Sequence, residues 1–318
     1  MRSFGFQHSA LSSRDEEQYF DLREILFDDG EKRKIMTQNV NGPCPLIAIT
    51  NGLVLGDRFS FNRDEFEVSL TRVSDSLSEM IRFLGSKNLR GDSKEIVDDK
   101  VESALLALRK CSKGLDVNMR FGRVDNFEFT HTLALFDILE IKLIHGWIPD
   151  ERTLSLISNR TYNEISAYVT QESDDSRSVK EWLDLNPTQL TMEGLEKLKC
   201  SLRDGEVAVL FRNNHFSTIT KYNGTLFTLV SDCGFKSIDG IVFESLVDVN
   251  QSSSFFTNGR FEEVNANGRV KQNRTEESAT NSSNSNHISW AEDLEKLQMR
   301  RDERERREGQ KEEERRAR

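Results

Sequence analysis

The stretch TQNVNGPCPLIAITNGLVL, residues 37–55, changes from a polar loop into an apolar helix, and a single cysteine stands between two prolines at the point of change. Apolar residues recur with a helical spacing from Leu46 to Leu53, and Pro45 suits the first helical position, where no N–H partner is needed. We therefore expect a helix that begins at Cys44 or beside it. There the helix dipole and unpaired backbone N–H groups favour a thiolate, which predicts a lowered thiol pKa and a nucleophilic Cys44. The competing interpretation is an inert, small apolar side chain.

Gln38 stands six residues before Cys44. From that position its side-chain amide can donate a hydrogen bond to the oxyanion that forms when a thiolate attacks a carbonyl carbon. Papain-like proteases place a glutamine at the same offset, so Gln38 is the predicted oxyanion donor. Taken alone, the same residue would be interpreted as a solvated loop side chain.

A general base is expected in the segment FRNNHFSTITKYNGTLFTLVSD, residues 211–232. Its Asn-Gly pair predicts a two-residue hairpin turn, and counting back along the ladder from that turn places His215 opposite Asp232. A histidine that faces a carboxylate across two strands is the base and orienter of a catalytic triad. The alternative is a surface histidine at the end of a hairpin. His131 and His145 also lie inside the domain, but neither faces an acid by the same argument.

One α+β domain is expected between residues 20 and 263. Helical spacing recurs in five segments, which are 45–54, 64–84, 96–110, 129–139 and 192–202. Runs rich in β-branched and aromatic residues follow at 206–211, 215–221 and 225–232, with Asn-Asn and Asn-Gly turn signals between them. The sequence therefore predicts helices packed on an antiparallel meander.

The two ends of the chain are expected to lie outside this domain. Residues 1–19 are predicted to be a flexible N-terminus. Residues 264–287 are rich in Asn, Ser and Thr and cannot bury enough apolar surface to offset their ordering entropy, which predicts a disordered linker. Residues 288–318 are mostly charged, which is typical of a solvated helix with many ion pairs. A partner-binding helix that uses Trp290 and Leu294 is the alternative.

Composition argues against several classes of function. The net charge of the 318 residues is −10, which disfavours nucleic acid as a partner because phosphate binding needs a basic face. We find no signal peptide and no apolar run of the roughly 18 residues that span a bilayer. Four cysteines lie far apart without a C-x-x-C pair, which argues against a zinc site, and the missing signal peptide argues against disulfides. We expect a soluble monomer without metal, cofactor or membrane contact, located in the cytoplasm, with the nucleus as a second location.

Eight motifs in one order make this sequence similar to a known family. They are TQNVNGPCPLIAI, GLDVNMRF, FEFT, HGWIPD, TYN, LFRNNHFSTI, LVSDCGF and FESL, and they cover roughly residues 20–263. The set resembles the MINDY deubiquitinases, cysteine proteases that cleave ubiquitin chains joined through lysine 48 of ubiquitin. The resemblance implies an α+β cysteine protease domain with papain-like chemistry. It also implies that Cys44 is the nucleophile, His215 the general base and Gln38 the oxyanion stabiliser, with no metal or cofactor.

The resemblance further implies a surface for ubiquitin and lysine-48-linked polyubiquitin. The family's contacts fall in four of the motifs and map here to Asp116, Val117, Trp147, Tyr162 and Phe211. Large aromatic side chains concentrate binding energy in interfaces, and an acidic residue suits the arginine-bearing tail of ubiquitin. Ordinary core packing is the alternative for the three aromatic residues.

Two departures from the family pattern matter. Cys233 follows a Ser-Asp pair where the family has glutamine after Thr-Asp, so an amide near the expected site is missing. The tail matches the ubiquitin-binding helix of some relatives only partly, and we assign no such helix to it. Two other functions stay open, namely a catalytically silent ubiquitin-binding module and a thiol protease or acyltransferase that acts on another protein.

Overall fold

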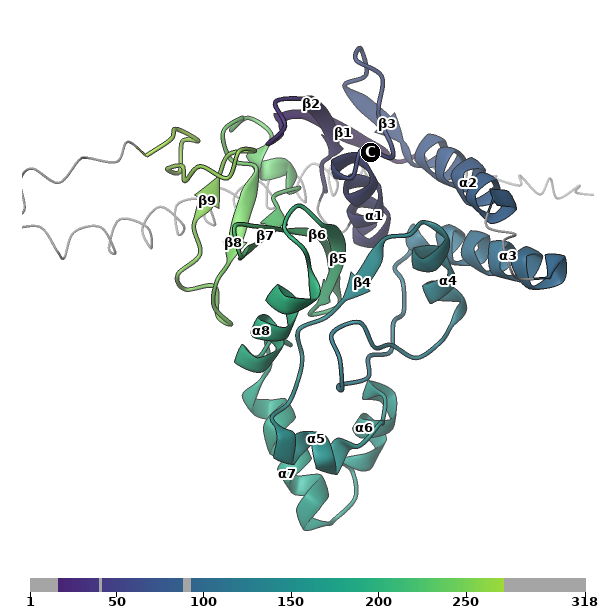
Figure 1. The fold of residues 1–318 in the computed structure, drawn as a ribbon, viewed down its shortest axis with the longest axis vertical. Helices are drawn as coiled ribbons and strands as arrows, with labels where there is room; N and C mark the ends of the chain where they lie inside the picture. Colours follow the sequence, from purple (N-terminus) through teal and green to yellow (C-terminus); the bar gives the residue numbers. More distant parts are fainter. Residues whose placement is uncertain (1–16, 40–41, 88–92, 272–318) are drawn as a thin grey trace, which may run out of the picture.

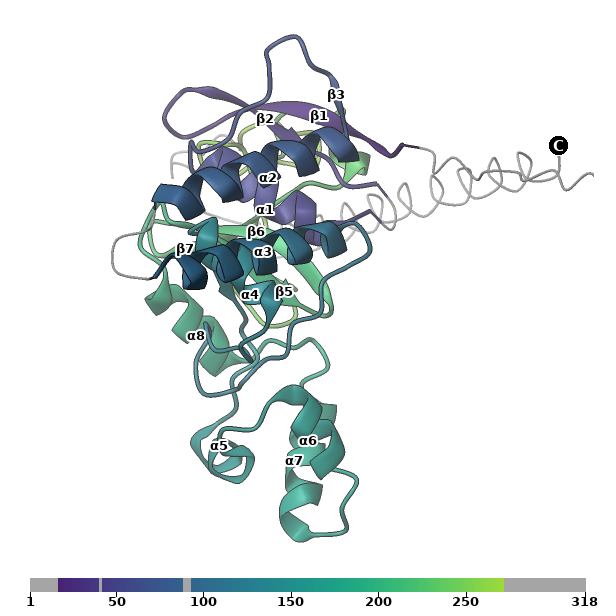
Figure 2. The ribbon, with the colours of Figure 1, turned by 90° about the vertical axis from the view of Figure 1, so that its right-hand side faces the viewer.

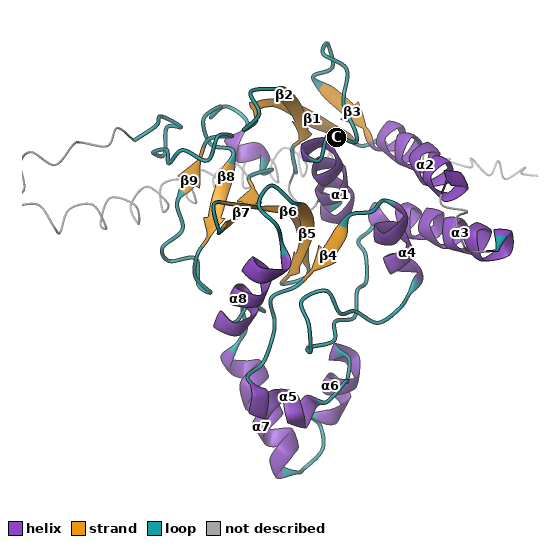
Figure 3. Ribbon diagram, in the orientation of Figure 1, coloured by secondary structure: helices purple, strands orange, loops and turns teal. Residues whose placement is uncertain are grey.

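The computed structural model describes residues 17–39, 42–87 and 93–271, which form an α+β domain with two sheets (Figures 1 and 3). The smaller sheet is antiparallel, has the order β2-β1-β3, and consists of β1 (Tyr19–Leu26), β2 (Lys32–Met36) and β3 (Glu67–Ser69). The larger sheet has six strands in chain order, which are β4 (Lys142–Ile144), β5 (Val207–Arg212), β6 (His215–Tyr222), β7 (Thr225–Leu229), β8 (Phe243–Leu246) and β9 (Phe256–Thr257). Strand β4 is parallel to β5, and the other pairs are antiparallel.

The helices cover the sheets and add a separate lobe. They are α1 (Cys44–Leu55), α2 (Leu70–Lys87), α3 (Lys94–Cys111), α4 (His131–Ile138), α5 (Glu151–Ile157), α6 (Tyr162–Tyr168), α7 (Asp174–Leu185), α8 (Met192–Ser201) and the 3-10 helix η1 (Cys233–Phe235). Helices α2 and α3 run side by side on the outer side of α1 (Figure 2). Within the described ranges, no helix is long and apolar enough to cross a membrane. The same ranges contain no group of three or more His, Cys, Asp or Glu side chains that could hold a metal ion.

Helix α1 lies in the centre of the domain and packs on β6 of the large sheet and β2 of the small one. Every residue from Pro45 to Leu55 is buried. The Thr218 hydroxyl of β6 donates a hydrogen bond to the carbonyl of Ala48 at 3.0 Å. On the opposite side, the Asn51 amide bonds both backbone groups of Met36, at 2.7 and 2.9 Å. These bonds fix the rotation of α1 and therefore the direction in which its first side chain points.

The antiparallel meander is present as predicted, and both of its predicted hairpin turns occur. The turn residues have φ angles of 52° and 56° at 213–214 and of 48° and 76° at 223–224, which is the type I′ geometry that Asn and Gly tolerate. Tyr222 pairs with Thr225 across the second turn. Turn chemistry therefore sets the register of the strands next to the site.

The small sheet and the parallel strand β4 are not predicted by the sequence pattern. The segment 64–84 is predicted as one helix with Phe66 on its apolar face, but the structure places strand β3 there before α2 begins. Val68 pairs with Phe20 of β1 and is 3 % exposed, whereas Phe66 is 77 % exposed. Pairing and burial at the sheet edge outweigh the helical spacing at this end of the segment.

The folded region continues past residue 264, where the sequence predicts the start of a linker. Val264 is fully buried, and its N–H donates to the carbonyl of Phe256 at 2.9 Å. Residues 264–271 therefore belong to the domain. The rest of the predicted linker and the tail 288–318 lie outside the described residues. Of the predicted flexible segment 1–19, the last residue begins β1.

Helices α5, α6 and α7 form a lobe that projects from the sheets in both views (Figures 1 and 2). The chain enters and leaves this lobe through a neck formed by Gly146, Leu190, Thr191 and Gly194. Gly146 pairs with Leu190, and the Thr191 N–H donates to the Gly146 carbonyl at 3.1 Å. A Cβ on Gly194 would lie 1.8 Å from the same carbonyl oxygen, so only glycine allows this approach.

Candidate active site

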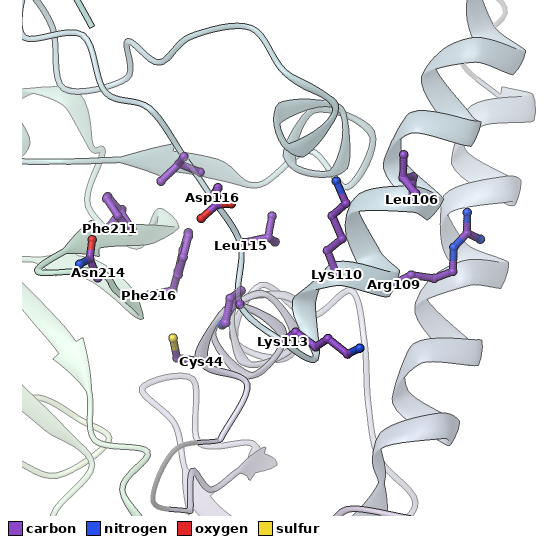
Figure 4. A pocket seen from close by; sticks show the side chains of 13 residues that line it. Cys44, Leu106, Arg109, Lys110, Lys113, Leu115, Asp116, Phe211, Asn214 and Phe216 are labelled. Atoms are coloured by element: carbon purple, nitrogen blue, oxygen red, sulfur yellow. The ribbon is translucent and has the colours of Figure 1, made fainter. Parts of the chain in front are cut away.

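Cys44 is the first residue of α1, and its side chain is half-buried. The sulfur points from the start of the helix toward Phe216 of β6 (Figure 4), and the Phe216 backbone forms a hydrogen bond with the thiol. The Cys44 N–H donates to the carbonyl of Gly42 at 2.8 Å, and Pro45 has no N–H. The first two residues of α1 therefore offer no free amide to an oxyanion in this conformation. A side-chain donor beside them can fill this role.

Burial raises the pKa of the Cys44 thiol, and this effect exceeds the opposing hydrogen bonds from the backbone of Phe216 and of Cys44 itself. The expectation that the helix start lowers this pKa is therefore wrong for the free protein. Removing a thiolate from water outweighs the attraction of the helix dipole. The nucleophile rests as a neutral thiol and must give its proton to a base before it attacks a carbonyl carbon.

Alkylation tests this protonation state. Cys200 is exposed, whereas Cys44 is half-buried with a raised thiol pKa. We expect iodoacetamide to modify Cys200 first at pH 7, and Cys44 to react only as the pH rises, because the thiolate is the reacting form. Peptide mass spectrometry over a pH series measures both rates in one sample. Faster modification of Cys44 than of Cys200 at pH 7 would contradict the raised pKa.

Gln38 is held beside the turn that leads into α1. Its N–H donates to the carbonyl of Ser231 at 2.6 Å, and its own carbonyl accepts from the Cys233 N–H at 3.0 Å, so that Gln38 forms a parallel bridge with Asp232. A Cβ placed on Gly42 would lie 3.4 Å from Cγ of Gln38. The side chain of Gln38 therefore begins against the backbone of the cysteine turn.

His215 is the first residue of β6 and is exposed, with Arg212 as its partner in the β5–β6 hairpin. The next residue is Phe216, whose backbone contacts the Cys44 thiol. Strand β6 therefore brings the histidine into the neighbourhood of the sulfur. Helix α1 and strand β6 pack against each other in the core. The proximity of His215 to the Cys44 sulfur therefore does not depend on the conformation of a loop.

The β6–β7 ladder follows the predicted register only as far as Ile219 and Thr228. Strand β7 ends soon afterwards, and Asp232 lies in the loop that follows. There it forms the bridge with Gln38, and its Oδ1 accepts a hydrogen bond from the Gly234 N–H at 2.6 Å. The cross-strand position predicted for Asp232 is therefore replaced by one in the loop, because the chain turns away to pair with Gln38. A role for Asp232 in orienting the base remains a proposal.

A cavity of about 660 Å³ opens beside Cys44 (Figure 4). One wall comes from the start of α1 and the β5–β6 hairpin, and the other from the end of α3 and the loop that follows it. The other wall residues, which the sequence did not mark as site residues, are Pro45, Leu106, Arg109, Lys110, Lys113, Gly114, Leu115, Asn214 and Phe216. Arg109 and Lys110 could have been noticed in the last turn of the predicted helix 96–110, where cations complement the helix dipole.

Three of the five expected ubiquitin-binding residues line this cavity. Asp116 is exposed, Val117 is half-buried, and Phe211 is 5 % exposed with its ring 4.9 Å from that of Phe216. The cavity therefore combines apolar side chains and the Asp116 carboxylate with three basic side chains, Arg109, Lys110 and Lys113. The apolar side chains and the carboxylate suit an extended peptide that has apolar and basic residues, whereas the three cations suit acidic groups.

Trp147 and Tyr162 lie elsewhere, where the lobe meets the body. Trp147 is 4 % exposed, and its ring centre lies 5.5 Å from those of Phe121 and Trp182 and 5.7 Å from that of Tyr162. Tyr162 is 37 % exposed. In this structure Trp147 is a core residue and Tyr162 is its surface neighbour. Of the two, only Tyr162 presents a substantial surface to a partner.

His145 has a structural role in the same region. It is fully buried, its Nε2 lies 3.2 Å from the Arg120 carbonyl, and its Nδ1 lies 3.3 Å from the backbone nitrogen of Trp147. A neutral ring that donates from Nε2 and accepts at Nδ1 satisfies both contacts. Burial lowers the pKa of His145 to about 4, so the ring stays uncharged at neutral pH.

This lowered pKa predicts a loss of stability in acid. The unfolded chain binds a proton at a pKa near 6.5, whereas the folded chain does so only near 4, so stability is complete above pH 6.5 and falls as the pH falls toward 4. The contribution is about 3 kcal/mol. Urea unfolding at pH 7 and pH 4 should show a larger loss for the wild type than for His145→Gln. Equal losses in the two proteins would show that His145 is not buried in the neutral form.

Comparison with known proteins places these residues in a family. Residues 18–261 match the family model described as MINDY deubiquitinase. Ubiquitin carboxyl-terminal hydrolase MINDY-2 of Mus musculus is 37 % identical over 245 residues, which is 71 % of this chain and 39 % of that protein. Ubiquitin carboxyl-terminal hydrolase MINDY-1 of Danio rerio is 35 % identical over 248 residues, which is 74 % of this chain and 48 % of that protein.

The human ubiquitin carboxyl-terminal hydrolase MINDY-1 is 34 % identical over 237 residues, which is 71 % of this chain and 50 % of that protein. The chain thus spans half or less of the length of these relatives. The matched residues 18–261 nevertheless contain every strand of both sheets, together with the cavity beside Cys44. By the extent of this match, the chain belongs to the MINDY deubiquitinase family.

Proposed function

We propose that this chain is a thiol-dependent deubiquitinase that hydrolyses isopeptide bonds in lysine-48-linked polyubiquitin. The observation that carries the proposal is the cavity in which the Cys44 sulfur meets the His215 hairpin, with Gln38 held at the turn into the same helix. Membership of a family described as deubiquitinases supports the class of reaction. The preference for lysine-48 linkage rests on the sequence resemblance.

The first half of the proposed reaction forms a thioester. His215 takes the proton of the Cys44 thiol, and the sulfur attacks the carbonyl carbon of the C-terminal glycine of ubiquitin. The Gln38 amide donates a hydrogen bond to the oxyanion. The C–N bond to the lysine side chain then breaks, and the imidazolium of His215 gives its proton to the departing amine.

The second half releases ubiquitin and restores the thiol. Water attacks the thioester carbonyl while His215 takes one of its protons, and the oxyanion is again held by Gln38. The C–S bond breaks, and the proton returns to the sulfur of Cys44. Because burial raises the pKa of this thiol, the protonated resting state is restored after each cycle.

Ubiquitin recognition is proposed to involve two surfaces. Asp116 and Phe211 line the cavity, where the carboxylate can pair with an arginine of the ubiquitin tail and the ring can contact its apolar residues. Tyr162 is exposed where the lobe meets the body and would contact the folded part of ubiquitin. Trp147 would act indirectly by supporting the ring of Tyr162.

A panel of tetra-ubiquitins, each with a single linkage type, tests the proposal. The wild type should cleave the lysine-48-linked chain and leave the others intact on the same time scale. Cleavage of every linkage would overturn the specificity but keep the reaction. Cleavage of none would overturn the proposed function.

A ubiquitin probe with an electrophilic C-terminus separates the rival functions. Covalent labelling that requires Cys44 supports the enzyme. Tight binding without labelling would indicate a silent ubiquitin-binding module. Neither binding nor labelling would indicate a thiol protease or acyltransferase with another substrate.

A further inference from the structure

Arg23 is a buried arginine that the proposed reaction does not use. It lies in β1 and is 3 % exposed. Its two terminal nitrogens donate to backbone carbonyls, Nη1 to Phe235 and Nη2 to Val230, both at 3.2 Å. Its Nε is buried without a hydrogen-bond partner. A guanidinium is expensive to bury, so its retention in the core calls for a reason.

The segment that Arg23 holds is the one that positions Gln38. Residues 230–235 leave β7, and the two hydrogen bonds from Arg23 fix both ends of this loop. The middle of the loop forms the bridge with Gln38, through the Ser231 carbonyl at 2.6 Å and the Cys233 N–H at 3.0 Å. A shift of the loop would therefore shift the backbone of Gln38.

Strand β1 also holds the other side of Gln38. The carbonyl of Asp21 accepts from both the N–H and the hydroxyl of Thr37, at 2.9 and 3.0 Å. The carboxylate of Asp21 forms an ion pair with Lys236, just after η1, at 2.8 Å. The backbone of Gln38 thus lies between β1 and the loop 230–235. Strand β1 itself holds this loop through Arg23 and Asp21, and Arg23 supplies the buried hydrogen bonds.

We propose that Arg23 is a positioning residue for the oxyanion donor: through the carbonyls of Val230 and Phe235 it holds the loop that sets the position of Gln38. The inference rests on the proposed function, because it assigns the purpose of Arg23 to the same reaction. The position of Gln38 matters because the Cys44 N–H is already bonded to Gly42 and Pro45 has none. Neither of the two residues that begin α1 can therefore compensate with a backbone N–H for a displacement of Gln38.

Kinetics of Arg23→Met test the proposal. The substrate is a lysine-48-linked tri-ubiquitin with a fluorophore and a quencher. We expect kcat to fall by about 10- to 100-fold with KM changed by less than about threefold, because the loss is bounded by the roughly 10²- to 10³-fold effect of removing one oxyanion donor. Arg23→Lys should recover part of kcat, since an ammonium can reach one of the two carbonyls. A rise in KM with kcat unchanged would overturn the inference.

A double-mutant cycle with Gln38→Ala separates positioning from general destabilisation. If Arg23 acts through Gln38, the double variant Arg23→Met with Gln38→Ala should be no slower than Gln38→Ala alone, within about twofold. If the factor lost in Arg23→Met persists in the double variant, Arg23 does not act through Gln38. Leu77→Ala is the control for loss of thermal stability, because it truncates a fully buried side chain of α2 that belongs to a different hydrophobic cluster from Val230 of the loop.

Amide hydrogen exchange gives a readout that needs no activity. The N–H groups of Gln38 and Cys233 both donate in the bridge, so their protection reports whether the loop is in place. We expect both amides to exchange at least about tenfold faster in Arg23→Met, with β6 unchanged. Unchanged protection would overturn the inference. If the wild type cleaves no ubiquitin substrate, the proposed function fails, while the exchange result still decides the role of Arg23.

Discussion

Replacement of Cys44 by alanine is expected to reduce cleavage of lysine-48-linked chains by at least about 10⁴-fold, because no other group in the cavity can form the thioester. His215→Ala should have an effect of similar size. The thiol rests protonated, since burial raises its pKa, and without a base the reacting thiolate is scarce. Gel assays of chain cleavage over hours measure both losses.

Two replacements serve as matched controls for this prediction. His131 is the first residue of α4, and its Nδ1 lies 2.7 Å from the hydroxyl of Ser103 in α3, so His131→Gln should leave turnover near the wild-type value. Cys200→Ser removes the exposed thiol and should do the same. Full activity of His215→Ala together with an inactive His131→Gln would show that the base is assigned to the wrong histidine.

Trp147→Ala is expected to destabilise the protein by about 3–5 kcal/mol, which is typical for truncation of a buried aromatic residue. Its ring contacts Phe121 in the body and Trp182 in α7, so truncation removes one of the aromatic contacts that join the lobe to the body. Chemical denaturation measures the loss. A change below about 1 kcal/mol would show that Trp147 is not part of the core.

Tyr162→Ala is the matched comparison for Trp147→Ala. Tyr162 packs on the edge of the same cluster but is 37 % exposed, so its truncation should change stability by only about 1 kcal/mol. If its exposed face binds ubiquitin, affinity should fall by roughly 30-fold, which corresponds to a binding hot spot of about 2 kcal/mol. Binding of a catalytically inactive variant to ubiquitin, measured by calorimetry, separates the two effects. Unchanged affinity in Tyr162→Ala would remove this residue from the proposed surface.

Short sequence patterns correctly predict the helix that begins at Cys44 and the hairpin turn at 223–224. A proline after Cys44 and a run of apolar residues indicate a helix, and Asn-Gly at 223–224 indicates a turn that needs positive φ angles. Both signals depend on a few adjacent residues, and the structure contains both elements. The proximity of α1 and β6 was not visible in either segment. It follows from tertiary bonds such as the one between Thr218 and Ala48.

Features that depend on distant parts of the chain could not be predicted. The pKa of Cys44 rises because of neighbours that cover it, and no local pattern encodes that burial. Asp232 leaves the ladder because Gln38, nearly two hundred residues earlier, offers a competing backbone partner. Arg23 is charged within a strand and would be expected at the surface, yet its partners are carbonyls on a loop far along the sequence.

The neck at Gly146 and Gly194 has a consequence for how this protein can vary. Since the two ends of the excursion through α5, α6 and α7 are joined at one point, the distance that the excursion must bridge is close to zero. Insertions and deletions in it therefore change little in loop-closure entropy and apply no tension to the strands beyond the neck. Over generations, the outer surface of the lobe, away from Tyr162 and the bonds between Thr161 and the body, is free to be remodelled for different targets while Cys44, His215 and Gln38 keep their spacing.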